Sequence, residues 1–317
     1  MQKDFSIVVP VFNEAESLRE LTANIEKAFS NVKKSFEVIF VDDGSTDKSL
    51  DILKRTASEN KNVRVLSFRK NLGKSLALTL GFQMANARYI ATLDADLQDD
   101  PSNIMPLIQK LTRGEYDLVS GWRKNRKDHI LKILSSRLFN RVAVPLLFGI
   151  KLNDLNSGLK VYKSEVAKSL RIYGGMHRFI PVIAAEMGFS VTEKEVLHHR
   201  RKYGESKYKS SKILTDLPDL LTIYFITRYN RRPLHFFGKI GGIVFGIGLI
   251  ILVYLSYLRL FLDQKIGDRP LLLLGILLVI AGIQTLFTGL LADLIVNTNS
   301  KKDEFSVKYD SKEHHPA

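Results

Sequence analysis

The sequence contains no cysteine, which excludes disulfides, thiol nucleophiles and zinc sites built on cysteine. Acidic residues are fewer than basic residues. The 33 Asp and Glu stand against 47 Lys and Arg and give a formal net charge of +14 at pH 7. This excess favours an anionic partner, which can be a nucleic acid, a phosphorylated substrate or an acidic membrane surface.

Several familiar signatures are also absent. No G-x-G-x-x-G follows the first predicted strand, which disfavours a dinucleotide-dependent dehydrogenase, and no Walker-type loop is present. No signal peptide precedes the first strand, so we expect the front of the chain to stay in the cytoplasm.

Residues 5–122 alternate between strand-like and helix-like patterns. We expect strands at residues 5–11, 36–41, 63–67, 89–93 and 117–121, with helices at 14–30, 46–60, 74–87 and 101–113 between them. This rhythm predicts an α/β fold with a mostly parallel, doubly wound sheet. Ligands of such folds bind at the carboxyl ends of the strands.

Polar and charged residues recur at those strand ends. The fourth strand runs into D-A-D-L-Q at residues 94–98, where Asp94 and Asp96 could converge on one hard cation. Oxygen ligands of this kind suit Mg²⁺ or Mn²⁺, which bind one or two carboxylates together with substrate phosphates. The alternative interpretation of the motif by itself is a solvated acidic turn.

The C-terminal third is apolar. Residues 234–262 and 270–296 each exceed the roughly 20 residues needed to span a bilayer. The alternative, two helices buried in a soluble core, is disfavoured because such runs are rare in soluble domains. Basic residues precede the first run and follow the second, so the positive-inside rule predicts a multi-pass protein with both termini in the cytoplasm. The flanking residues are Arg228, Arg231, Arg232, Lys301 and Lys302.

Glycines repeat in both runs, at 238, 242 and 246 and at 275, 282 and 289. Small residues in such registers allow close helix packing within or between chains, and we expect a homo-oligomer. Residues 123–149 and 207–229 combine basic and apolar side chains, which predicts helices in the membrane interface. Ordinary amphipathic helices packed on the sheet are the alternative. The predicted division is a cytoplasmic domain at 1–229, a transmembrane domain at 230–300 and a polar tail at 301–317.

Three motifs in order carry a resemblance to a known family. S-I-V-V-P-V-F-N-E at residues 6–14, V-D-D-G-S-T-D at 41–47 and D-A-D-L-Q at 94–98 resemble the signature of family-two glycosyltransferases with the A-type fold. The resemblance implies a metal held by Asp94 and Asp96 with help from Gln98. It also implies a nucleotide-sugar site, to which we assign Pro10, Phe12, Glu14, Asp42, Asp43, Lys74, Asp94 and Ala95.

The middle of the chain narrows the resemblance to polyprenyl-phosphate glycosyltransferases, which include dolichol-phosphate mannose synthase. N-D-L-N-S-G-L-K at residues 153–160 is similar to their D-x-x-S-G-F-K/R box, with Leu159 where an aromatic is common. H-R-F-I-P at 177–181 and H-R-R-K-Y-G-E-S-K-Y at 199–208 resemble two further segments. With two C-terminal spans, the chain is most similar to GtrB-type enzymes, which glucosylate undecaprenyl phosphate.

The remaining candidate residues follow from the expected substrates. Arg201 and Lys207 lie on a loop that could close over the donor diphosphate. Cationic and hydroxyl groups suit the acceptor phosphate, and Asp154 could act as a base or position the acceptor. The phosphate candidates are Arg123, Lys132, Ser136 and Arg137.

We therefore expect a metal-dependent, inverting glycosyltransferase that makes a polyprenyl-phosphate sugar at the inner membrane. Glucose from UDP-glucose is the first donor, and mannose from GDP-mannose or an amino-arabinose are alternatives. A nucleic-acid-binding protein is disfavoured because the carboxylate edge would repel phosphates. A processive polysaccharide synthase lacks support because no Q-x-x-R-W motif is present. A zinc site at His177, His198 and His199 lacks a recognisable carboxylate ligand.

Overall fold

The computed structural model describes residues 2–30, 32, 34–124, 144–200, 202–203, 222–229, 232–267 and 270–299. The chain divides into two compact units, Met1–Leu220 and Leu221–Ala317. Each unit is described by itself.

The first unit is built on a seven-stranded sheet with the order β3-β2-β1-β4-β6-β5-β7. Strands β1, β2, β3 and β4 are parallel, and β5 is parallel to β7, whereas β6 runs antiparallel to both of its neighbours. The strands are β1 (Lys3–Val11), β2 (Phe36–Asp42), β3 (Val63–Ser67), β4 (Ala87–Thr92), β5 (Leu118–Trp122), β6 (Lys160–Lys163) and β7 (Val191–Glu195).

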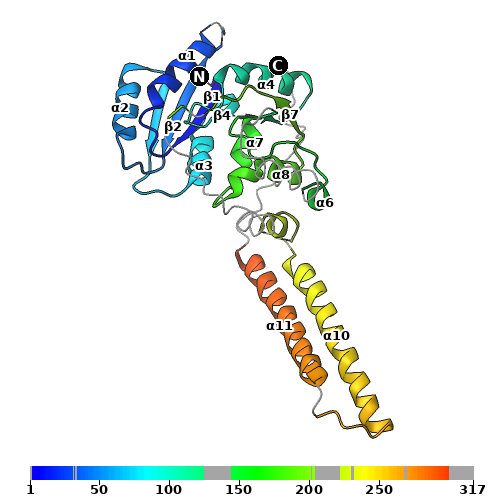
Figure 1. Cartoon of the computed structure of the whole chain (residues 1–317). Helices are drawn as coiled ribbons and strands as arrows, with labels where there is room; N and C mark the ends of the chain where they lie inside the picture. The colour runs from blue at the N-terminus through cyan, green and yellow to red at the C-terminus, as the bar shows by residue number, and fades with distance from the viewer. Residues whose placement is uncertain are drawn as a thin grey trace. The chain divides into compact units, whose positions relative to one another are not determined.

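Helices connect the parallel strands and pack on the sheet (Figure 1). The predicted mostly parallel α/β architecture is confirmed. The helices of this unit are α1 (Leu18–Phe29), α2 (Ser49–Glu59), α3 (Lys74–Met84), α4 (Ile104–Arg113), α6 (Val144–Phe148), α7 (Ser164–Ser169) and α8 (Ile180–Glu186), with short 3₁₀ turns η1 (Pro101–Asn103) and η3 (Met176–Phe179).

The central strands are apolar because helices cover both of their faces. In β1, Ile7, Val8 and Val9 are completely buried although they alternate between the two faces. Gly81 of α3 lies against Val8, so that a Cβ at this glycine would meet the Val8 side chain at 2.3 Å. Close packing of α3 on β1 fixes the start of α3, where Lys74 lies.

The structure adds two strands that the sequence pattern does not predict. β6 and β7 are four and five residues long. β6 lies between β4 and β5 and pairs with residues about 70 positions away, for example Ala91 with Val161. A run this short carries little periodicity, and long-range pairing decides its place.

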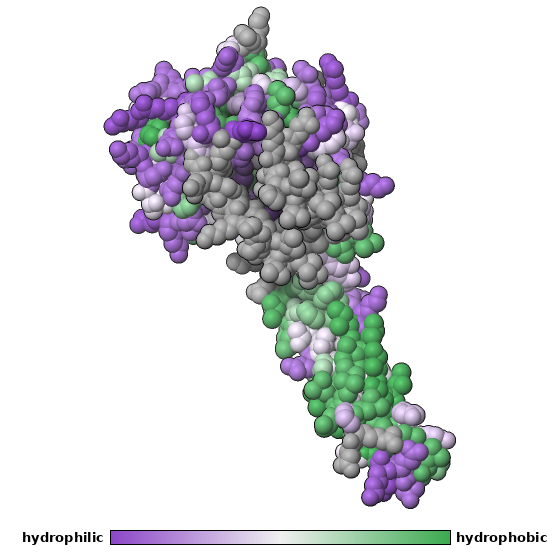
Figure 2. All heavy atoms as spheres, viewed as in Figure 1, coloured by the Kyte–Doolittle hydropathy of each residue, from purple (hydrophilic) through white to green (hydrophobic). Residues whose placement is uncertain are grey.

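The second unit contains two long helices, α10 (Pro233–Phe261) and α11 (Pro270–Asn299). Both are long and apolar enough to cross a membrane, and only 11% of the apolar window of each is buried. Figure 2 shows the apolar surface along them. This exposure argues against the alternative of two helices buried in a soluble core.

Glycines on a seven-residue register bring α10 and α11 together. A Cβ on Gly282 would lie 2.6 Å from the Phe245 backbone nitrogen, and one on Gly248 would lie 2.8 Å from the Val279 nitrogen. The predicted register at 275, 282 and 289 therefore packs against α10. The helix α10 presents Gly241 and Gly248 to this contact, whereas nothing lies within 4 Å of a Cβ built on Gly242 or Gly246.

These contacts predict that substitution destabilises one glycine position of α10 and α11 and leaves another unaffected. Gly282→Leu forces the α10 and α11 backbones apart and lowers stability by about 1–3 kcal/mol, as overpacking does. Gly242→Leu enters open space and is the matched control. Thermal unfolding of the two purified variants in detergent measures the difference, and equal midpoints would contradict the described packing.

Candidate active site

Two loops at the carboxyl ends of β1 and β2 are joined by hydrogen bonds. The Asn13 amide donates to Ser45 Oγ over 2.9 Å, and the Thr46 amide donates to Asn13 Oδ1 over 2.8 Å. Asn13 has φ of 51°, a backbone conformation that asparagine tolerates better than most residues. These two hydrogen bonds hold the loop that carries Pro10, Phe12 and Glu14 at this edge of the sheet, and all three residues are half-buried.

Asp42 and Asp43 organise the same edge from within. Asp42 is buried and accepts hydrogen bonds from the Ser67 hydroxyl at 2.7 Å and the Ser45 amide at 3.2 Å. Asp43 accepts from the Leu72 and Gly73 amides. Burial, together with the adjacent Asp42 charge, raises the pKa of the Asp43 carboxyl. The two predicted donor-site carboxylates therefore also fix the loops around them.

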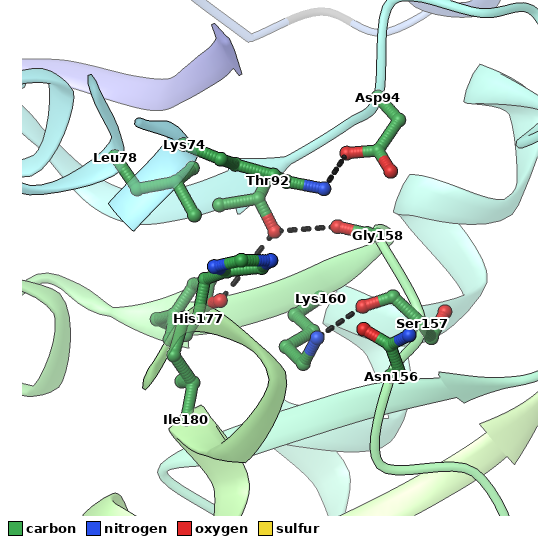
Figure 3. A pocket seen from close by; sticks show the side chains of 11 residues that line it. Lys74, Leu78, Thr92, Asp94, Asn156, Ser157, Gly158, Lys160, His177 and Ile180 are labelled. Carbon is green, nitrogen blue, oxygen red and sulfur yellow. Dashed lines mark hydrogen bonds and ion pairs between the residues drawn. The ribbon is translucent and has the colours of Figure 1, made fainter. Parts of the chain in front are cut away.

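Lys74 and Asp94 face each other at the centre of the edge. Lys74 begins α3 directly after Gly73, and Asp94 follows β4 by two residues. Lys74 Nζ donates to Asp94 Oδ1 over 2.5 Å (Figure 3). Burial opposes ionisation of Asp94, but the Lys74 charge and hydrogen bond outweigh it and lower the pKa of the carboxyl. The site thus holds an ionised carboxylate beside an ammonium.

Gly158 is required by the position of Asp94. A Cβ at Gly158 would lie 2.5 Å from the Asp94 carboxyl carbon. Gly158 also accepts a hydrogen bond from the Thr92 hydroxyl at its carbonyl, over 2.8 Å. The box at residues 153–160 therefore packs directly against the D-A-D turn. The distance between the two motifs in the sequence gives no sign of this contact.

Asp96 and Gln98 share the turn that follows β4. The Gln98 amide donates to Asp96 Oδ1 over 3.2 Å, and the intervening Leu97 has φ of 60°. Asp94, Asp96 and Gln98 offer hard oxygen ligands, and no described residue donates to Oδ2 of Asp94, so this donor set fits a divalent cation. Within the described ranges, no three His, Asp or Glu side chains form a ready-made metal cluster. A cation here takes its further ligands from a substrate.

Arg123 and Asp154 form a buried bidentate ion pair. Arg123 Nε donates to Asp154 Oδ2 over 2.7 Å and Nη2 donates to Oδ1 over 2.9 Å. Only 12% and 3% of the two side chains are exposed. Burial works against the charge of Arg123, but the Asp154 partner outweighs it and raises the pKa of the guanidinium. The geometry of Asp154 is that of a residue that orients Arg123.

A recess beside Asp94 contains residues to which the sequence analysis gave no site role. Lys160 and Tyr162 of β6 are buried and share one strand face, and His177 reaches the recess from η3 (Figure 3). Burial, and next the Lys74 charge, lower the pKa of Lys160 to about 7. Burial, and next Lys74, also lower the pKa of His177 to about 3. The available signal was in two motifs of the sequence analysis, because Lys160 ends the box at residues 153–160 and His177 begins H-R-F-I-P at 177–181.

The other predicted residues have different outcomes. Ala95 is buried between the two aspartates. His198 pairs with Asp99 and His199 with Asp100, away from His177 in the recess. Five candidates lie outside the described residues, namely Lys132, Ser136, Arg137, Arg201 and Lys207.

The fold is shared with solved glycosyltransferases. Glucosyl-3-phosphoglycerate synthase from Mycobacterium tuberculosis, in a crystal structure with Mn²⁺, UDP-glucose and phosphoglyceric acid, matches 71% of this chain and 79% of its own, with a TM-score of 0.54 and 20% identity. The likeness at this identity concerns the fold alone.

The sequence comparisons define the family. Residues 6–171 match the family described as glycosyl transferase family 2, and this chain belongs to it. The chain is 38% identical to dodecaprenyl-phosphate galacturonate synthase from Rhizobium johnstonii, over 95% of this chain and 90% of the relative. It is 32% identical to undecaprenyl-phosphate 4-deoxy-4-formamido-L-arabinose transferase from Pseudomonas paraeruginosa, over 92% and 84%.

The buried ion pair predicts a strong coupling between Arg123 and Asp154. Asp154→Ala leaves the guanidinium buried without its carboxylate and destabilises the protein by about 3–5 kcal/mol. Adding Arg123→Met to this variant recovers most of that loss, because no buried charge then remains unpaired. Thermal unfolding of the parent, both single variants and the double variant tests the coupling. Simple additivity of the two changes would refute it.

Lys160 predicts a pH-dependent stability. Between pH 7 and its ordinary pKa of 10.5, the unfolded chain binds more protons at this residue than the folded chain. Its contribution therefore becomes more favourable as pH rises through this window. Lys160→Met has the higher thermal midpoint at pH 7, and its advantage narrows toward pH 10. Lys163→Met, on the same strand, is the control, and an advantage independent of pH would contradict the prediction.

Proposed function

We propose that the protein transfers a sugar from a nucleotide-sugar to a polyprenyl phosphate at a membrane. The observation that carries the proposal is the D-A-D turn, with Asp94 held against Lys74 at the carboxyl edge of the sheet, in a chain that also has two spans of membrane length. The two relatives named above act on polyprenyl phosphates by name, which supports the acceptor class.

The donor binds along the loops that follow β1, β2 and β4 in this proposal. Pro10, Phe12 and Glu14 contact the nucleotide with Asp42 and Asp43 behind them. Asp94 and Asp96, with Gln98, hold Mg²⁺ or Mn²⁺, which supplies charge neutralisation for the departing nucleoside diphosphate. The Mn²⁺ in the structural relative supports a divalent cation of this kind.

The chain's own residues supply orientation and fixed charge. The Lys74 ammonium lies where negative charge grows on the leaving diphosphate and stabilises that charge. Arg123, oriented by Asp154, binds the acceptor phosphate through Nη1, which the Asp154 pair does not use. A phosphate oxygen is already anionic at neutral pH, so its attack needs little help from a general base. Direct attack at the anomeric carbon inverts its configuration.

The membrane topology in this proposal follows the charges around the spans. Arg228 and Arg232 lie before α10, and Asp263 follows it. The positive-inside rule therefore places both termini and the first unit on the cytoplasmic side of the inner membrane. Association of several copies also stays a prediction, for which the open glycines Gly242 and Gly246 offer a close-packing face.

The donor sugar is tested with a panel. Purified protein is incubated with undecaprenyl phosphate, Mn²⁺ and one donor at a time. The donors are UDP-glucose, GDP-mannose, UDP-galacturonate and a UDP-formamido-arabinose, and mass spectrometry identifies the sugar added to the lipid. Glucose is the donor expected from the sequence resemblance, whereas the names of the two relatives support galacturonate or formamido-arabinose. The absence of any glycosylated lipid across the panel would overturn the proposed function.

The metal site predicts loss of transfer in Asp96→Ala. Removal of one of two carboxylate ligands lowers the transfer rate about 100-fold or more, the size expected for loss of charge stabilisation. EDTA stops the parent enzyme, and added Mn²⁺ restores it. Asp51→Ala, at an exposed position of α2, is the matched control. Full transfer in the presence of EDTA would show that the carboxylates do not hold a required metal.

A further inference from the structure

The chain that follows β7 pairs with the residues directly after the D-A-D turn. We call residues 197–203 the strap, and the structure describes all of them except residue 201. Asp99 and His198 form an antiparallel bridge, and the His199 amide donates to the Gln98 carbonyl over 2.7 Å. The strap therefore contacts the backbone of Gln98, one of the proposed metal ligands.

Both ends of the strap are anchored to other parts of the first unit. At one end, the Asn103 side chain donates to the Leu197 carbonyl and accepts from the Leu197 amide, each over 3.2 Å. At the other end, Lys202 Nζ donates to both carboxyl oxygens of Glu20 in α1, over 3.0 and 2.8 Å. This exposed ion pair contributes little, but Tyr203 beside it packs against the hydrophobic core. The strap is thus held in place independently of the D-A-D turn.

The turn needs support from outside because its backbone is strained. Leu97 has φ of 60°, in the left-handed region that a leucine rarely adopts. A residue keeps such a conformation only where the surrounding structure imposes it, and strain of this kind gathers at functional sites. Here the Leu97 side chain is buried in the core, and the Gln98 amide reaches Asp96 Oδ1 over 3.2 Å. The strained residue thus lies between two proposed metal ligands.

Two His–Asp pairs join the strap to the chain after the turn, and they differ in burial. His198 Nδ1 lies 3.2 Å from Asp99 Oδ1, and 15% and 3% of the two side chains are exposed. His199 Nε2 lies 3.1 Å from Asp100 Oδ2, and 57% and 29% are exposed. A carboxylate only accepts, so the imidazole donates in both pairs. Loss of the buried pair leaves a polar group unsatisfied, whereas loss of the exposed pair costs little.

We propose that His198 is a positioning residue for the metal site. Through Asp99 it holds the strained turn in the conformation in which Asp96 and Gln98 can share one divalent cation with Asp94. His198 acts through Asp99 and is not itself a ligand. The inference rests on the proposed function, because it assumes that the D-A-D turn binds a metal. When only a fraction of the molecules has the competent turn, the apparent affinity for the metal falls by that fraction.

The first test measures Mn²⁺ binding without turnover. The full chain in detergent is titrated with Mn²⁺ in the presence of UDP and, in a second series, of GDP, and the electron paramagnetic resonance signal reports free Mn²⁺. We expect His198→Ala to weaken Mn²⁺ binding about 10-fold, the lower end of the range for losing an outer-shell partner of a metal site.

Three further variants assign this effect to the buried pair. His198→Asn places an amide nitrogen where the Nδ1 donor lies and retains most of the affinity. His198→Phe keeps a ring but has no donor, so it shows the same loss as His198→Ala and replaces that variant if it does not fold. His199→Ala removes only the exposed pair and binds Mn²⁺ like the parent, which makes it the matched control.

Transfer kinetics separate positioning from folding. In His198→Ala, the Mn²⁺ concentration for half-maximal transfer rises about 10-fold, while kcat at saturating Mn²⁺ stays at the parent value because bound metal restores the competent turn. A purely structural role of His198 would instead reduce the amount of folded enzyme. It would lower the rate at every Mn²⁺ concentration and leave the half-maximal concentration unchanged.

Each adverse result has a distinct meaning. Equal Mn²⁺ affinity in the parent and in folded His198→Ala or His198→Phe would overturn the inference while the proposed function stands. An equal loss in His199→Ala would also overturn it, because the effect would then not come from the buried pair. A parent enzyme that binds no Mn²⁺ with either nucleotide would overturn the metal site of the proposed function, and the inference with it.

Discussion

The contact between the Lys74 ammonium and the Asp94 carboxylate joins the two loops on which the site is built. Lys74 begins a helix whose position is fixed by the close approach of Gly81 to β1, and Asp94 lies two residues beyond the end of strand β4. The pair also restricts which residues can lie next to it. Gly158 has to lack a side chain because the Asp94 carboxylate fills that space, and an ionised Asp94 is stable in this half-buried place because Lys74 compensates it.

Charge compensation explains much of the remaining architecture. Asp154 is compensated by Arg123 with two hydrogen bonds, and this pair is nearly sealed from solvent. Lys160 is the exception, because its hydrogen-bond partner among the described residues is the neutral Ser157 carbonyl. A buried group that stays under-compensated is expected at functional sites rather than in a core selected only for stability. This contrast sets Lys160 apart from the other buried charges of the first unit.

The sequence predicted the parallel part of the sheet and both apolar helices well, because each is a local pattern. Strand Val63–Ser67 has the predicted bounds, and α10 differs from its predicted range by one residue at each end. The recess was not predictable in this way. Lys160 and His177 lie 66 and 83 residues after Asp94, and no local period records that the antiparallel strand β6 inserts beside β4. The sequence also did not show which glycines of α10 contact α11. The predicted register was 238, 242 and 246, whereas Gly241 and Gly248 make the contact.

The sequence by itself determined the class of fold, the apolar spans and the family, because alternating periodicity, long hydrophobic runs and short motifs are written in consecutive residues. Only the tertiary structure decided which charges meet. It paired Arg123 with Asp154, set Lys74 on Asp94 and buried Lys160 beside His177. The physical reason is that the energy of a charge depends on burial and on neighbours within a few ångströms, and both are properties of the folded chain.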